Sequence, residues 1–149
     1  MIEPRLIFRP YKGKVDPEMA SKTLLYNVSE PVGKGCPNLA DDVLLVRFFL
    51  RRISQAPDVK GPYFDMPLVP TYDPQLSNAI LWFQKAVAAA HAPVTADGRV
   101  DPSPNGQGWY TIRHLNFSYR KRFPQYGHLI ENDPVFPGAL RAPLAMANV

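Results

Sequence analysis

The residues best suited to metal or thiol chemistry are three histidines and one cysteine, and they are scattered along the chain. His91, His114 and His128 form no metal-ligand pair at helical spacing, so we interpret each as a surface or helix-end residue. Cys36 is the single cysteine and therefore offers neither an internal disulfide nor a thiolate pair. The pattern predicts no metal site.

Acidic residues form two close pairs, and neither predicts acid–base catalysis. Asp41 and Asp42 fall in the first turns of a predicted helix, where carboxylates suit the positive end of the helix dipole. Asp97 and Asp101 belong to a turn. Neither pair has a neighbouring base or apolar pocket that would raise a carboxyl pKa. Because nucleophile and phosphate-loop motifs are also missing from the sequence, we expect a protein that is not an enzyme and needs no cofactor.

Aromatic side chains are the better candidates for binding. Tyr63, Phe64 and Tyr72 lie in a proline-rich loop, and Trp82 lies off the main buried face of a predicted helix. An aromatic platform beside polar groups suits a sugar ring or a peptide, although rings in such a loop also serve to fill gaps beneath it. The candidate ligand-binding set is Tyr63, Phe64, Tyr72, Trp82, Arg99 and Trp109.

The charge balance favours an anionic partner. The formal net charge is +4 and the sequence pI is about 9.3, which suits a cell-wall polymer, a membrane surface, an acidic protein or nucleic acid. The run from Tyr119 to Arg122 contains three consecutive cations that could meet phosphates. Cations also favour the carboxyl end of a helix, and we adopt this explanation. Nucleic acid is therefore not the expected partner.

Three amphipathic segments, residues 39–53, 74–90 and 109–121, are predicted to be the helices that position these side chains. Apolar residues recur in them at three- and four-residue steps, the spacing of one helical face. The predicted buried positions are Val43, Val46, Leu50 and Ile53, then Leu76, Ala79, Ile80, Phe83 and Val87, then Trp109, Ile112, Leu115 and Tyr119. This pattern predicts a mainly α protein with a compact three-helix core.

Polar residues mark the ends and the outer side of these helices. Asn38 is predicted to cap the first helix, and Asp73 the second, with Pro74 in its first helical position. Arg47 and Arg51 lie one turn apart, on what we expect to be the polar strip of the first helix.

Proline is over-represented, with 17 residues against a usual share of roughly 5%. Proline density excludes a helix from residues 56–72 and predicts a long ordered loop or an interaction loop. We predict three parts: an extended arm over 1–31 with one or two short strands, a helical domain over 32–123, and a proline-rich tail over 124–149 that packs on the core.

Taken in order, these segments resemble the peptidoglycan-binding-domain-like superfamily, a compact three-helix fold. The resemblance covers roughly residues 32–117. It includes the helix segment AILWFQ at residues 79–84, the turn DGRVDP at 97–102 and the closing segment at 109–116. Residues 67–74 depart from the family's turn before the second helix. The residues that carry the structural motif are Gly33, Gly35, Phe83, Gln84, Asp97, Gly98, Leu115 and Asn116.

Most of these motif residues have a structural explanation. Gly98 permits a turn that a side chain would strain, and Gln84 places an amide where it can tie a loop backbone to the helix. Leu115 closes the core, and Asn116 is expected to satisfy the end of the third helix. The motifs therefore predict packing first and ligand binding second.

Three functions remain open. The resemblance implies a non-catalytic module that binds peptidoglycan. With no signal peptide at the N-terminus, we expect synthesis in the cytoplasm and, for a module that acts on the wall, export by a dedicated secretion or injection system. The second is a protein–protein adaptor, chaperone or structural component that contacts a partner or another subunit through its proline-rich arms. The third is a cell-wall hydrolase with site residues distant in sequence. No stretch approaches the ~20 apolar residues that a membrane span needs.

Overall fold

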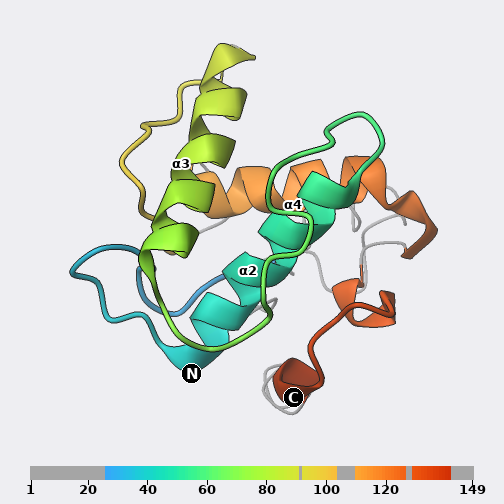
Figure 1. The fold of residues 1–149 in the computed structure, drawn as a ribbon, viewed down its shortest axis with the longest axis horizontal. Helices are drawn as coiled ribbons and strands as arrows, with labels where there is room; N and C mark the ends of the chain where they lie inside the picture. Colours follow the sequence, from blue (N-terminus) through green and yellow to red (C-terminus); the bar gives the residue numbers. More distant parts are fainter. Residues whose placement is uncertain (1–25, 91, 104–109, 127–128, 142–149) are drawn as a thin grey trace, which may run out of the picture.

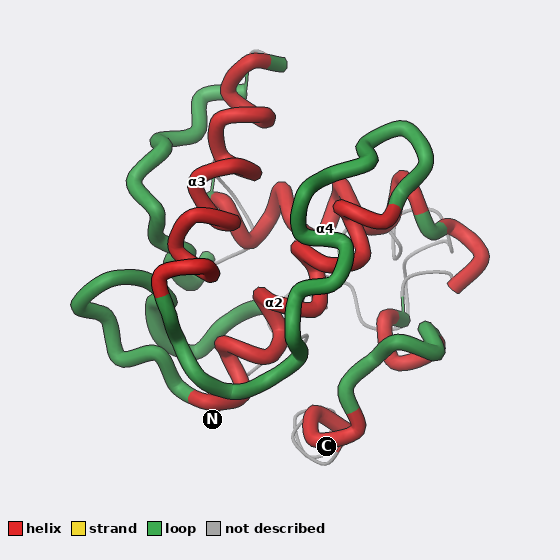
Figure 2. The backbone as a smooth tube through the Cα atoms, in the orientation of Figure 1, coloured by secondary structure: helices red, strands yellow, loops and turns green. Residues whose placement is uncertain are grey.

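The computed structural model describes residues 26–90, 92–103, 110–126 and 129–141 (Figure 1). These described residues form three α-helices, α2 (Ala40–Gln55), α3 (Pro74–Ala89) and α4 (Thr111–Arg122). Three short 3₁₀ turns follow α4, namely η1 (Pro124–Tyr126), η2 (Ile130–Asn132) and η3 (Gly138–Leu140). Figure 2 shows loops between the helices and no strand in the described part. The predicted mainly α, compact three-helix fold is confirmed.

Some expectations fall outside the described residues. They are Trp109, two of the three histidines and most of the N-terminal arm with its predicted strands. The nearest feature to a sheet in the described part is an isolated antiparallel bridge between Val32 and Val100. None of the described helices is long and apolar enough to cross a bilayer.

Helix α2 is the centre of the core and packs against α3, α4 and η3. Phe48 and Phe49 are both fully buried, and their rings lie 5.5 and 5.7 Å from the ring of Tyr119 on α4. A helix that is apolar on nearly all sides must be covered on nearly all sides, and α4 and the C-terminal turns supply this cover. The predicted inward positions of α4 that the structure describes, Ile112, Leu115 and Tyr119, are all buried.

Helix α3 begins as predicted. Pro74 is its first residue, and the carboxylate of Asp73 accepts a hydrogen bond from the backbone N–H of Leu76 at 2.9 Å. The predicted buried face is confirmed through Phe83, but Val87 is only partly buried. Figure 1 shows the reason: the carboxyl end of α3 projects beyond the other two helices.

The predicted cap of α2 is wrong. The capping position is Leu39, without a side-chain cap, and Asn38 adopts a positive φ of 51°. The Asn38 side chain accepts from the N–H of Gly33 at 2.8 Å and donates to the carbonyls of Gly33 and Cys36 at 2.9 and 3.0 Å. Asparagine tolerates this backbone conformation, and the turn over residues 33–36 places three polar groups within its reach.

The predicted polar strip of α2 is also wrong at Arg47, whose side chain is 0% exposed. Its guanidinium donates to the carbonyls of Pro67 and Thr71 at 3.3 and 2.6 Å and lies 3.3 Å from the Asp73 carboxylate. The loop over residues 56–72 folds back across this side of α2 and covers it (Figure 1). A buried cation is tolerable here because these acceptors pair with both of its terminal nitrogens, although its Nε has no hydrogen-bond partner in the described part of the chain.

Asp42 is a third polar residue whose environment differs from the expectation. It is fully buried, and its two carboxylate oxygens accept from the backbone N–H groups of Ser29 and Glu30 at 3.0 and 3.1 Å. Burial raises the pKa of Asp42 to about 6, although these two hydrogen bonds act to lower it. The expectation that no acidic pair would show a raised carboxyl pKa is therefore wrong, because residues 26–31 cover the amino end of α2.

Asn116 was expected to satisfy the end of the third helix, but α4 continues to Arg122 and places Asn116 in its interior. The Asn116 side chain accepts from the N–H of Tyr26 at 2.7 Å and donates to the carbonyls of Tyr26 and Ile112, both at 2.8 Å. This carboxamide therefore ties Tyr26, which is itself buried in the core, to the middle of α4.

Candidate functional site

A groove of about 340 Å³ lies between the outer faces of α3 and α4. Residues that line it include Trp82, Ala86 and Val87 of α3, Ala90 just after it, Phe117 and Lys121 of α4, and Val59 of the loop after α2. On each helix the lining residues recur at three- and four-residue steps, so each presents one continuous ridge. The small side chains of Ala86 on the α3 ridge and of Ala90, the residue that caps α3, leave the space open.

The walls of the groove are apolar and its rim is cationic. Lys121 is exposed at the rim and forms no ion pair with any residue that the structure describes. Arg122 lies beside it, but its guanidinium pairs with the carboxylate of Asp58 at 3.2 Å. Burial, and then the neighbouring Arg113, lower the pKa of His114, which keeps this lining residue neutral at neutral pH. The positive charge at the groove therefore comes mainly from Lys121.

Trp82 is held in place by the loop after α2, which packs against its ring. Its ring lies 5.6 Å from the ring of Tyr63 at an interplanar angle of 59°. A Cβ on Gly61 would lie 2.7 Å from the Trp82 ring and 2.6 Å from the hydroxyl of Ser54, so the loop can pass this closely only with glycine. The indole is therefore a fixed part of the groove wall.

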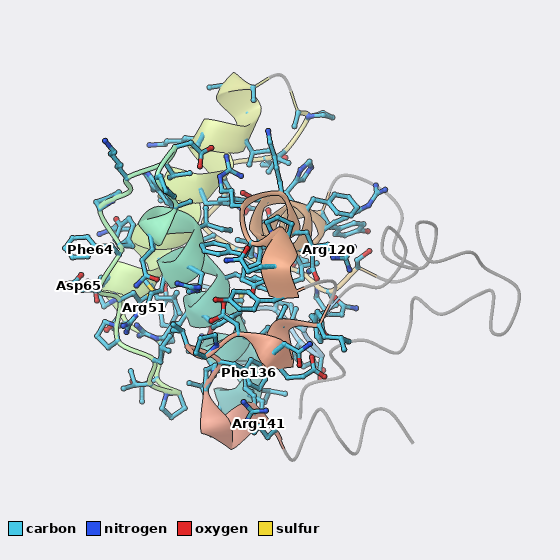
Figure 3. All side chains as sticks on the ribbon, turned by 90° about the vertical axis from the view of Figure 1, so that its right-hand side faces the viewer. Arg51, Phe64, Asp65, Arg120, Phe136 and Arg141 are labelled. Carbon is cyan, nitrogen blue, oxygen red and sulfur yellow. The ribbon has the colours of Figure 1, made fainter. Side chains whose placement is uncertain are left out.

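The structure brings together only part of the predicted ligand-binding set. Tyr63 and Trp82 are in contact, and Trp82 lines the groove. Tyr72 is partly buried against the core, away from the groove lining. Phe64 is 57% exposed and lies at the edge of the molecule in Figure 3. Arg99 lies in a separate cavity.

That second cavity has a volume of about 170 Å³ and a polar lining that includes Asp97, Arg99, Asp101 and Tyr110. The Arg99 guanidinium pairs with the Asp101 carboxylate at 2.7 Å, and this contact raises the pKa of Arg99. The Asp97 carboxylate accepts from the backbone N–H of Arg99 at 2.9 Å. Because the charged groups satisfy one another within the turn, the cavity offers less for an external ligand than the groove does.

Gln84 confirms the structural role predicted for the motif. Its amide nitrogen donates to the carbonyl of Arg99 at 2.8 Å, to the hydroxyl of Thr111 at 3.0 Å and to the carboxylate of Asp97 at 3.1 Å. Its oxygen accepts from the N–H of Gly98 at 2.9 Å. Gly98 has the predicted positive φ, 75°. One buried amide thus joins α3, the turn and the start of α4.

Sequence reasoning missed the residues that make the groove. Phe117 and Lys121 lie one turn apart on α4 and both line the groove; Lys121 was assigned to the polar end of a helix, and Phe117 received no assignment. The available signal was the cluster of small residues from Ala86 to Ala90, which predicts a shallow place on α3. It did not indicate which element lies opposite.

The groove offers apolar walls and one exposed cation to a ligand. Among the described residues that line the groove, none is a carboxylate. Within the same described part of the chain, no group of three or more His, Cys, Asp or Glu could hold a metal ion. Cys36 lies away from the groove, and its thiol donates to the carbonyl of Lys34 at 3.7 Å. Comparisons with protein-family models, curated proteins and solved structures find no match to this chain.

Proposed function

We propose that this protein is a non-catalytic binding module that takes up peptidoglycan fragments in the groove between α3 and α4. The observation that carries the proposal is an apolar groove with the fixed indole of Trp82 in its wall and, at its rim, the ammonium of Lys121, which forms no ion pair with any described residue. The sequence resemblance to peptidoglycan-binding-like domains supports the same choice of ligand.

The chemistry of the ligand matches these two groups. Peptidoglycan joins sugar rings, whose C–H faces pack on aromatic rings, to short peptides that carry methyl groups and carboxylates. The apolar walls suit the sugar faces and methyl groups, and the ammonium of Lys121 suits a carboxylate. The groove volume is at the lower end of the usual range for small-ligand sites, roughly 300 to 1,000 Å³, so it fits a short fragment of the polymer.

The test is co-sedimentation with purified, protein-free sacculi at low salt. We expect the wild type to enter the pellet, and K121E to bind about tenfold more weakly because one charge-assisted contact is lost. Trp82→Ala should weaken binding at least as much, provided that its circular dichroism and melting curve are those of a folded protein. Lys85→Glu is the matched control, since Lys85 is exposed on α3 and does not line the groove.

Two outcomes would reject the proposal. One is a wild-type protein that stays in the supernatant at low salt. The other is equal weakening by the Lys121 and Lys85 substitutions, which would show that binding depends on net charge alone.

A protein adaptor is the second candidate, and a different observation favours it. Phe64 and Val69, on the loop after α2, are the two large hydrophobic side chains that are exposed in the described part of the chain, at 57% and 40%. An exposed aromatic ring such as that of Phe64 is a suitable anchor for a protein contact.

A further inference from the structure

The loop over residues 56–72 is held in place by hydrogen bonds on the side that faces α2. Arg47, Arg51 and Gln55 of α2 donate hydrogen bonds of 2.6 to 3.3 Å to the loop carbonyls of Phe64, Met66, Pro67 and Thr71. The Met66 side chain is fully buried beneath the loop. The backbone of the loop is therefore held in one conformation. A partner that binds the outward side chains does not have to order this backbone, so the entropy cost of binding is small.

Two neighbouring side chains on this loop form an apolar knob with a charge beside it. The ring of Phe64 is 57% exposed, and the exposed carboxylate of Asp65 forms no ion pair with any described residue. Figure 3 shows Phe64 and Asp65 together at one edge of the molecule, with Arg120 well away from them. An aromatic ring beside a carboxylate is complementary to an apolar pocket with a cation near it.

The same chain carries such a pocket. The groove between α3 and α4 has apolar walls, and Lys121 stands at its rim without an ionic partner among the described residues. Its volume of about 340 Å³ is ample for a phenyl ring, since a cavity of roughly 150 Å³ binds benzene. Phe64 does not line the groove of its own chain, and the hydrogen bonds to α2 hold the loop where it is.

We propose that the loop of one copy docks in the groove of a second copy, with Phe64 between α3 and α4 and Asp65 against Lys121. The loop and the groove are different surfaces. In a pair of copies, one keeps a free groove and the other a free loop, so further copies can add head to tail. The inference concerns the groove of the proposed function but requires no binding of glycan.

Sedimentation velocity over a concentration series, at low salt and without any glycan, tests the proposal. We expect the weight-average sedimentation coefficient of the wild type to rise with concentration and to fall again when salt is added. Phe64→Ser should weaken association by about tenfold or more, because the ring would be the buried anchor. Val69→Ser, on the same loop and also exposed, is the matched control and should have a clearly smaller effect.

Charge reversal gives the sharper test. D65K and K121E should each associate at least about tenfold more weakly alone, because like charges then face each other. An equal mixture of the two variants should recover association, since every contact between unlike chains again pairs opposite charges. In the control mixture, D65K is combined with the double variant D65K/K85E; every contact then sets Lys121 against another lysine, and recovery is not expected.

A sedimentation coefficient that stays constant up to the highest soluble concentration overturns the proposal. So does a mixture of the two charge variants that fails to recover, or an equal loss with Phe64→Ser and Val69→Ser. The sacculus assay remains independent, because Phe64→Ser leaves the groove intact: loss of association with retained sacculus binding separates the two proposals.

Discussion

Asp42 shows how one buried residue can make stability depend on pH. Its carboxylate is enclosed at the amino end of α2, with two backbone N–H groups from residues 29 and 30 as donors. Desolvation exceeds these contacts and raises the pKa from 3.8 to about 6. The folded protein therefore binds the proton more tightly than the unfolded chain does. This group's contribution to stability is fully present below pH 4 and is lost as the pH rises through about 6.

Replacing Asp42 with asparagine should remove this pH dependence, because the carboxamide is neutral throughout. A difference of about two pKa units corresponds to roughly 3 kcal/mol. We expect the free energy of unfolding of the wild type, relative to Asp42→Asn, to fall by nearly that amount between about pH 3 and pH 8. Urea titrations at a series of pH values measure it. Parallel pH profiles for the two proteins would contradict the raised pKa.

At the scale of elements, the loop between α2 and α3 depends on cations from α2. Arg47 alone joins two loop carbonyls and the carboxylate of Asp73, which also caps α3. Its planar guanidinium can reach several acceptors at once, and neither lysine nor an apolar residue does the same. The loop and the start of α3 are therefore positioned together by one side chain.

Arg47→Met should destabilise the protein by about 2–3 kcal/mol, because it removes the donors for two carbonyls and leaves Asp73 without its cation. The loop should also become accessible to proteases. Limited proteolysis and urea unfolding measure these effects. Arg51→Met is the control: Arg51 makes a single 3.3 Å bond to the carbonyl of Met66 and is half-buried, so the loss should be under about 1 kcal/mol. Equal losses would contradict the role of Arg47.

Across the whole molecule, the C-terminal turns complete the core. Asp133 is fully buried, and its carboxylate accepts from the Arg52 guanidinium and the Tyr119 hydroxyl, both at 2.8 Å. Burial, aided by the hydrogen bond to Asp133, raises the pKa of Tyr119 well above its usual range and keeps its hydroxyl a donor. The ring of Phe136 packs 5.8 Å from that of Phe48. The described part of the tail is thus a structural layer over α2 and α4.

Removing this carboxylate should have a large effect. Asp133→Ala leaves a mostly buried guanidinium and a buried hydroxyl without their acceptor, and we expect a loss of about 3–5 kcal/mol in the free energy of unfolding. Asp58→Ala is matched, because it also breaks an Asp–Arg pair between distant segments, but Asp58 is 59% exposed and should cost at most about 1 kcal/mol. Chemical denaturation measures both. If Asp133→Ala lowered the free energy of unfolding by as little as Asp58→Ala, the contacts of Asp133 would contribute little to stability.

The sequence was sufficient for features that depend on neighbouring residues. The three helices, the Asp73 cap with Pro74, and the turn tied by Gln84 at Gly98 all follow from periodicity and local hydrogen bonding. For the candidate site, the sequence indicated Trp82 and its neighbour Tyr63 but not the groove between α3 and α4.

Only the tertiary structure decided the environments of Asp42, Arg47 and Asn116. It also decided that Lys121 lines the same groove as the apolar residues of α3. Helical periodicity shows which side of a helix is apolar, but it does not show which distant segment will cover a polar residue. Residues 26–31 cover Asp42, and the loop over 56–72 covers Arg47. Because burial and its energetic consequences depend on such long-range contacts, they were fixed only when the chain folded.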